Sequence, residues 1–321
     1  MPAVLGRHVA VVGAGFMGGG IAAELALCVA GLESVRVWDA APGAAAGAVG
    51  RAPEVARILV EAGVLPAAEG EARLARLVCP ASLRETLEGV DYVAEAVPED
   101  LALKQEVFRE LDALAPPEAV LASNTSGYDP AALAQGLGHP ERVLVAHYFG
   151  PAYLIPLVEV VPHAGTAGWA VERTLALLEG AGKLPVRLGR FVPGFVANRL
   201  QQALFREALA LVRDGIASPE AVDEVARWSF GPRLAALGPF TVADFAGLDV
   251  YASLATNVWP TLSAEPAAAG PPAELAARVD AGTLGVKSGA GFFQWPAERL
   301  QRALASRDAA LVQAMRRRSR P

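Results

Sequence analysis

A histidine and a glutamate near the middle of the chain have the residue types and spacing of a general base and its orienting carboxylate. His147 ends the apolar run Val143–Ala146, and Glu159 lies within the apolar run Leu157–Val161. A carboxylate in such a strand is costly to bury without a partner. A turn between residues 147 and 157 would place the two strands side by side, and Glu159 would then fix the tautomer of His147 and raise its basicity. The alternatives are a structural histidine and a Glu159 that faces solvent from an edge strand.

A glycine-rich segment near the N-terminus has the setting of a dinucleotide-binding loop. Residues 13–18 (GAGFMG) follow an apolar run and open a helical pattern. Gly13 would permit the tight turn, Gly15 the approach of a pyrophosphate, and Gly18 the close packing of helix on strand. Asp39 ends the second strand-like run, where a carboxylate would accept hydrogen bonds from ribose hydroxyls and repel a 2′-phosphate. The pattern predicts NAD over NADP, with FAD as a weaker option and a glycine turn of another α/β protein as the alternative.

Two further positions carry hydroxyl and amide groups that suit a reacting oxygen. The segment Ser123–Ser126 follows an apolar run, and Asn198 falls early in the first helical pattern after residue 187. Ligand pockets are frequent where two domains meet, which favours Asn198. The alternative for Ser123–Ser126 is a turn or a helix N-cap, because Ser, Asn and Thr are typical of both.

The arrangement of elements along the chain predicts how these groups are positioned. Apolar runs of strand type alternate with helical patterns over the first half, which indicates an α/β protein with a parallel, doubly wound sheet. The strand-like runs are 8–12, 35–38, 92–97, 119–123, 143–146 and 157–161, and the helical patterns are 21–30, 53–62, 103–114 and 169–179. After residue 187 the pattern is almost entirely helical, with Gly215 at a helix end and Ser218-Pro219 at a helix start. We therefore predict an NAD-binding domain over 1–187 and a second, all-helical domain over 188–321.

The composition excludes several classes of protein. The chain has 321 residues, of which 53% are hydrophobic and 19% charged, so it contains enough apolar material for a packed core. A net charge of −6 disfavours nucleic-acid binding. The two cysteines, Cys28 and Cys79, cannot form a disulfide framework and are expected to be small core residues; no metal-ligand cluster is visible. The sequence shows neither a signal peptide nor a membrane span, and we expect a cytoplasmic protein.

These features occur together in a known family. The sequence resembles the L-3-hydroxyacyl-CoA dehydrogenase family, including its lambda-crystallin and L-gulonate 3-dehydrogenase branch, from about residue 9 to about residue 292. The matching segments are VAVVGAGFMGGGIA, EAVPEDLALKQEVF, ASNTSGYDP, VAHYFGPAYLIPLVEVVPH, PGFVANRL, LGPFTVADFAGLD and GVKSGAGFF. The resemblance implies a Rossmann-type domain, a helical domain that forms a homodimer, and NAD as cofactor. It implies that His147 is the catalytic base, Glu159 its partner, and Ser126 and Asn198 contacts of the substrate oxygen. The implied NAD contacts are Gly13, Gly15, Phe16, Met17, Gly18, Asp39, Glu99 and Lys104.

The sequence also departs from the family pattern in ways that concern the substrate. Gly150 stands where the family usually has Asn, and Gly127 where it commonly has Ser. Residues 50–80 contain no lysine, so the charge that would meet a CoA phosphate falls to Arg51, Arg57, Arg73 and Arg76.

The main prediction for function is the reversible oxidation of an L-3-hydroxyacyl-CoA to the 3-oxoacyl-CoA, with a place in fatty acid metabolism. The same chemistry on a small 3-hydroxy acid without CoA, such as L-gulonate or carnitine, is the first alternative. A non-catalytic, crystallin-like protein that binds NAD(H) is the second.

Overall fold

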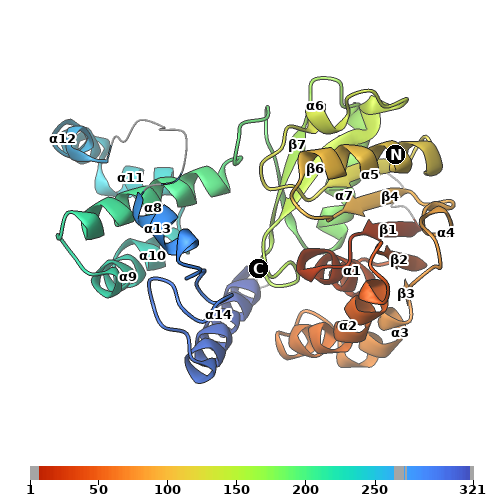
Figure 1. The fold of residues 1–321 in the computed structure, drawn as a ribbon, viewed down its shortest axis with the longest axis horizontal. Helices are drawn as coiled ribbons and strands as arrows, with labels where there is room; N and C mark the ends of the chain where they lie inside the picture. Colours follow the sequence, from red (N-terminus) through yellow and green to blue (C-terminus); the bar gives the residue numbers. More distant parts are fainter. Residues whose placement is uncertain (1–6, 264–270, 272, 319–321) are drawn as a thin grey trace. The chain divides into compact units, whose positions relative to one another are not determined.

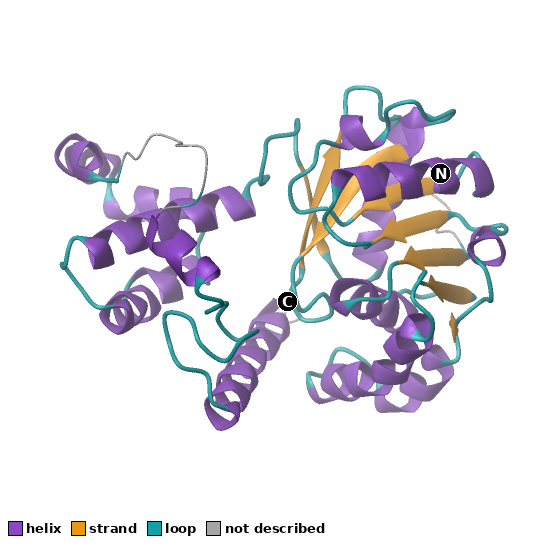
Figure 2. Ribbon diagram, viewed as in Figure 1, coloured by secondary structure: helices purple, strands orange, loops and turns teal. Residues whose placement is uncertain are grey.

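The structure is a computed structural model that describes residues 7–263, 271 and 273–318. The chain divides into two compact units, Met1–Val196 with Ala310–Pro321 and Ala197–Ala309. Figure 1 follows the chain by colour, and Figure 2 shows that the strands belong to the first unit.

The first unit is built on a single sheet of eight strands in the order β3-β2-β1-β4-β5-β6-β7-β8. Neighbouring strands are parallel except for β6 and β7, which run antiparallel. The strands are β1 (His8–Val12), β2 (Ser34–Trp38), β3 (Leu77–Val78), β4 (Tyr92–Glu95), β5 (Val120–Ser123), β6 (Val143–Tyr148), β7 (Leu157–Pro162) and β8 (Leu184–Arg187). The mostly parallel, doubly wound sheet predicted from the sequence is confirmed.

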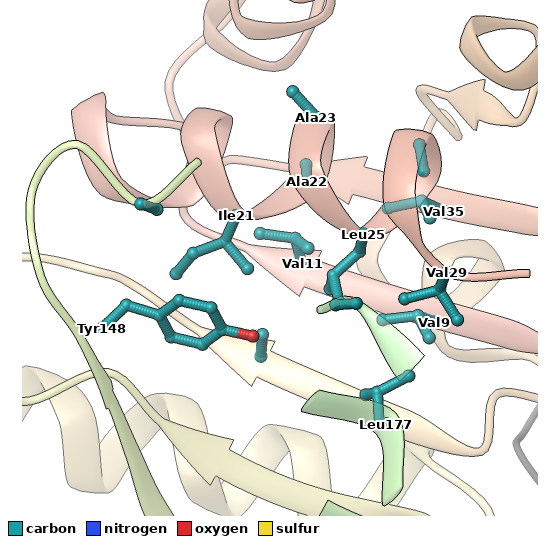
Figure 3. Close-up of a cluster of buried hydrophobic side chains, with 14 of the residues drawn as sticks. Val9, Val11, Ile21, Ala22, Ala23, Leu25, Val29, Val35, Tyr148 and Leu177 are labelled. Atoms are coloured by element: carbon teal, nitrogen blue, oxygen red, sulfur yellow. The ribbon is translucent and has the colours of Figure 1, made fainter. Parts of the chain in front are cut away.

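Helices cover both faces of this sheet, and the side chains of β1 alternate between the two cores. Val9 and Val11 pack with α1, α2 and α7, whereas Ala10 and Val12 pack with α4, α5 and α6. Figure 3 shows the first core, in which Ile21 of α1 lies near β1. The helices of this unit are α1 (Phe16–Cys28), α2 (Ala44–Glu61), η1 (Ala67–Glu69), α3 (Gly70–Leu74), α4 (Leu83–Leu87), α5 (Leu101–Leu114), α6 (Pro130–Leu133), η2 (Pro140–Arg142) and α7 (Gly168–Gly180). Because both faces are covered, the strands read as apolar runs.

The second unit is helical throughout the part of it that the structure describes, apart from isolated bridges between residues 285 and 294. Gly215 ends its first helix with a φ of +70°, and the Ser218 hydroxyl caps the second by accepting from the backbone N–H of Ala221 at 3.3 Å. Both ends were predicted. The helices are α8 (Ala197–Arg213), α9 (Pro219–Trp228), α10 (Phe230–Leu234), α11 (Pro239–Ala246), α12 (Leu248–Val258), η3 (Trp259–Thr261), α13 (Ala273–Asp280) and α14 (Ala297–Arg318), the last of which spans the division at Ala309/Ala310. Within the described residues, no helix is long and apolar enough to cross a membrane.

Some local predictions were incomplete or wrong. The two edge strands, β3 and β8, were missed, because β3 has two residues and β8 contains Pro185, which only an edge strand tolerates well. Helix α2 begins at Ala44 rather than at residue 53, since its first half is a run of Ala and Gly without a clear period. Cys79 is exposed, so its assignment to the core was wrong.

Candidate active site

His147 and Glu159 form a buried pair at the carboxyl end of β6. The antiparallel register of β6 and β7 sets the two residues directly opposite each other, with His147 Nδ1 3.1 Å from Glu159 Oε2. The two residues are 3% and 2% exposed. Since a carboxylate can only accept, Nδ1 carries the proton and Nε2 keeps its lone pair. The predicted juxtaposition is confirmed, and the alternative in which Glu159 faces solvent is wrong.

A short segment to which the sequence analysis assigned no role, Phe195–Val196, holds this pair in place. The backbone N–H of Val196 donates to the second oxygen of Glu159 at 3.0 Å. Phe195, which is fully buried and has a φ of +52°, packs its ring 5.3 Å from the imidazole, and Phe149 packs at 4.5 Å. The Pro-Gly-Phe sequence before Val196 was the available signal for this turn. The imidazole is therefore enclosed by aromatic rings and oriented by the carboxylate.

The glycine loop has the geometry that a bound pyrophosphate requires. A Cβ on Gly13 would lie 2.6 Å from the backbone of Ala96, and one on Gly18 would lie 1.8 Å from the carbonyl oxygen of Gly13. A Cβ on Gly15 would meet nothing within 4 Å, so the backbone at the N-terminus of α1 is open to an approaching ligand. The positive end of the helix also points there. The loop thus fits the pyrophosphate of NAD.

Asp39 lies against this loop at the end of β2. One carboxylate oxygen accepts from the N–H of Ala14 at 2.6 Å, and the other accepts from the N–H of Ala41 at 2.8 Å. Each oxygen retains a second lone pair for a ribose hydroxyl. Asp39 therefore fits the predicted role, and it also braces the loop, which the sequence alone did not indicate.

Phe16 and Met17 form the first turn of α1 and lie beside the segment that follows His147. Phe16 is 69% exposed. A Cβ built on Gly150 would lie 3.1 Å from Cε1 of Phe16 and 3.5 Å from the sulfur of Met17. Gly150, where the family usually has Asn, therefore leaves only narrow space for a larger side chain.

Glu99 and Ser126 lie next to each other at the carboxyl edge of the sheet. Glu99 Oε1 accepts from the N–H of Ser126 at 3.0 Å, and the Glu99 side chain is 45% exposed. Lys104 lies near them but is 1% exposed, and its ammonium is bound to Glu95 Oε1 at 2.8 Å and to the carbonyl of Val97 at 3.1 Å. The structure therefore presents Glu99 to a ligand and places Lys104 behind it. Glu95 was missed by the sequence analysis, although it lies in an apolar strand-like run (92–97) and therefore carries the same signal that predicted a partner for Glu159.

Asn198 belongs to the other unit, in the first turn of α8. Among the described residues no group of three or more His, Cys, Asp or Glu side chains is arranged to hold a metal ion.

The fold and the glycine loop define a class of protein, that of the Rossmann-type dinucleotide-binding proteins. The particular family follows from comparison with known proteins. The model of the 3-hydroxyacyl-CoA dehydrogenase NAD-binding domain matches residues 8–191, and that of the C-terminal domain of the same enzyme matches residues 194–295. The chain belongs to the 3-hydroxyacyl-CoA dehydrogenase family and is an NAD-dependent dehydrogenase, as the resemblance implied.

Two relatives and one solved structure are similar to the chain over most of its length. The chain is 35% identical over 308 residues to the 5-formyl-3-hydroxy-2-methylpyridine 4-carboxylate 5-dehydrogenase of Mesorhizobium japonicum, covering 95% of this chain and 96% of that protein. A crystal structure of an enzyme of this activity, described as an NAD+ dependent dismutase, matches with a TM-score of 0.88 at 34% identity over 97% of both chains. L-Carnitine dehydrogenase of Pseudomonas aeruginosa is 40% identical over 239 residues, which cover 74% of this chain and 72% of that enzyme.

Proposed function

We propose that the protein reversibly oxidises a secondary alcohol of a small substrate that does not carry CoA. Two observations support this substrate class over the acyl-CoA of the main sequence prediction. The similar dehydrogenases described above act, by their names, on carnitine and on a pyridine carboxylate. The observation on which the proposal rests is structural: most of the arginines between residues 50 and 80 already have partners within the protein.

Most of the positive charge that would meet a CoA phosphate is already engaged within the first unit. Arg57 is paired with Glu54 and Glu61 on α2. Arg73 is paired with Glu69, and Arg76 donates to the carbonyls of residues 26 and 29. Of the four arginines that replace lysine over residues 50–80, three are thus already bound to groups of the protein. A phosphate ester would have to compete with these partners for the guanidinium groups, whereas a small substrate makes no such demand.

The chemistry assigned to the chain's own residues follows from the buried pair. Bound NAD supplies the acceptor for the hydride that leaves the carbinol carbon. His147 Nε2 takes the hydroxyl proton in oxidation and returns it in reduction, and Glu159 stabilises the resulting imidazolium at 3.1 Å. Ser126 and Asn198 are proposed to contact the substrate oxygen, where charge changes during the reaction.

A substrate panel tests the proposal directly. Turnover of L-carnitine, L-gulonate and acetoacetyl-CoA by the 321-residue chain would be measured by NADH absorbance. We expect turnover of a small hydroxy acid to exceed that of acetoacetyl-CoA. Efficient reduction of acetoacetyl-CoA with no turnover of either small acid would instead establish the acyl-CoA activity.

The proposed function also gives each of the two predicted domains a role. Residues 1–187 would be the NAD-binding domain, and residues 188–321 would be a helical substrate and dimerisation domain. The helical unit supports the dimer, because its large apolar side chains are exposed: Trp228 is 77% exposed, Phe240 87% and Phe245 80%. Among its described residues only Leu209, Ala210 and Ala243 are buried hydrophobics, too few for a core of its own.

Light scattering after gel filtration tests the dimer. We expect a mass of twice 33.2 kDa. A monomer at micromolar concentration would contradict this assignment without affecting the proposed chemistry.

A further inference from the structure

Glu95, at the carboxyl end of β4, is fully buried, and both oxygens of its carboxylate accept hydrogen bonds from other groups of the protein. Oε1 accepts from Lys104 Nζ at 2.8 Å and from the N–H of Val97 at 2.7 Å, and Oε2 accepts from the Ser123 hydroxyl at 2.5 Å. Apolar residues in place of a buried ion pair are often at least as stable, so stability alone does not account for this pair. The groups that Glu95 holds indicate another role.

Ser123 and Lys104 connect Glu95 to the loop that carries Ser126. The Ser123 hydroxyl accepts from the N–H of Thr125 at 3.1 Å. Lys104 Nζ lies 3.5 Å from Glu99 Oε2. Each side of the Glu95 carboxylate is thus the start of a separate route from β4 toward the same loop.

The two routes meet at Glu99. Its Oε1 accepts from the Thr125 hydroxyl at 2.5 Å and from the N–H of Ser126 at 3.0 Å. The contacts therefore close a ring of side chains, drawn from the ends of two strands, from α5 and from the loops between them, and the backbone of Ser126 is attached to that ring. The members of the ring are Glu95, Ser123, Thr125, Glu99 and Lys104.

We propose that Glu95 is a positioning residue for the dehydrogenase reaction, which places Ser126 through Ser123 and Lys104. This inference rests on the proposed function, in which Ser126 contacts the substrate oxygen. The negative charge is essential, because without it the ammonium of Lys104 is left buried at 1% exposure beside a neutral group and relaxes toward Glu99 or solvent. The loop then shifts, and a misplacement of about 1 Å at a reacting group can cost about a hundredfold in rate.

A double-mutant cycle tests this route. Glu95→Gln, Ser126→Ala and the double variant would be compared in kcat and KM with whichever of L-carnitine, L-gulonate or acetoacetyl-CoA is turned over fastest. We expect Glu95→Gln to lower kcat by about ten- to a hundredfold, with a smaller change in the KM for NAD. The double variant should be little slower than the worse single variant, because both changes act on the same hydroxyl group.

A buried ion pair at the opposite end of the sheet provides the matched control. Asp112 holds the fully buried Arg142, which directly precedes β6, at 2.8 Å. Asp112→Asn also removes the charge beside a buried cation, so it should lower stability but leave kcat unchanged, and it should combine additively with Ser126→Ala.

The other possible results of these experiments also decide whether Glu95 positions Ser126. If Glu95→Gln does not fold, Ser123→Ala removes the Oε2 route while keeping the ion pair, and it should show the same non-additivity. Additive losses, or equal coupling in the Asp112 variant, would overturn the positioning role alone. Full turnover of Ser126→Ala would overturn the role of Ser126 in the proposed function, and this inference with it.

Discussion

The substitution Glu159→Gln isolates the electrostatic contribution of the buried carboxylate to catalysis. Glutamine keeps the size of the side chain and an oxygen that can accept from the N–H of Val196. Its amide group, however, carries no charge and presents donors to His147 Nδ1, which favours the wrong tautomer. The variant should therefore fold and bind NAD while failing to stabilise the imidazolium.

The expected loss follows from the 3.1 Å separation of Nδ1 and Oε2. Two unit charges about 3 Å apart interact by about 5 kcal/mol at an effective dielectric constant of ~20. The imidazolium charge is spread over the ring and centred farther away, which reduces the interaction to about 3 kcal/mol. At about 1.4 kcal/mol per factor of ten, kcat should fall by about two orders of magnitude.

The assay is steady-state NADH formation with the best substrate of the panel, together with NADH binding by fluorescence. Glu141→Gln is the matched control, because Glu141 lies 3.5 Å from His139 in an exposed pair where solvent screens the interaction. We expect unchanged turnover in the control. Less than a fivefold loss for Glu159→Gln, with NADH binding intact, would refute the assignment of this carboxylate.

Three further predictions concern the first unit. Gly18→Ala should destabilise the protein by about 1–3 kcal/mol in urea unfolding and weaken NAD binding, because the new Cβ would lie 1.8 Å from a carbonyl oxygen. Gly50→Ala, on an open face of α2, is the control and should change neither stability nor NAD binding. Asp39→Asn keeps an acceptor for the N–H of Ala14 but removes the charge, so the preference for NAD over NADP in initial rates should fall at least about tenfold. Burial raises the pKa of Glu24 to about 7 against the opposing effect of Lys183. Native Glu24 then holds its proton to a higher pH than the unfolded chain does, so stability should decline as the pH rises from about 4.5 to 7. Glu24→Gln should remove that decline, and equal slopes in both proteins would contradict it.

The sequence by itself determined the features that depend on short stretches of chain. The glycine loop, the strand-like runs and the cap at Ser218 each follow from backbone restrictions or burial patterns that a few residues express. The His147–Glu159 pair was also predictable, because one turn between antiparallel strands suffices to bring the two residues together. The apolar surroundings of Glu159 required that it have a partner.

Only the tertiary structure decided which polar groups meet across the sheet. Glu95 and Ser123 are 28 residues apart and become neighbours because β4 and β5 pair in parallel register, with Glu95 opposite Ser123. The ion pairs of Lys104 with Glu95 and Glu99 depend on the same strand pairing and on the packing of α5. The sequence could not supply these contacts, because the partner of a buried charge is selected by the register and packing of distant segments rather than by its neighbours along the chain.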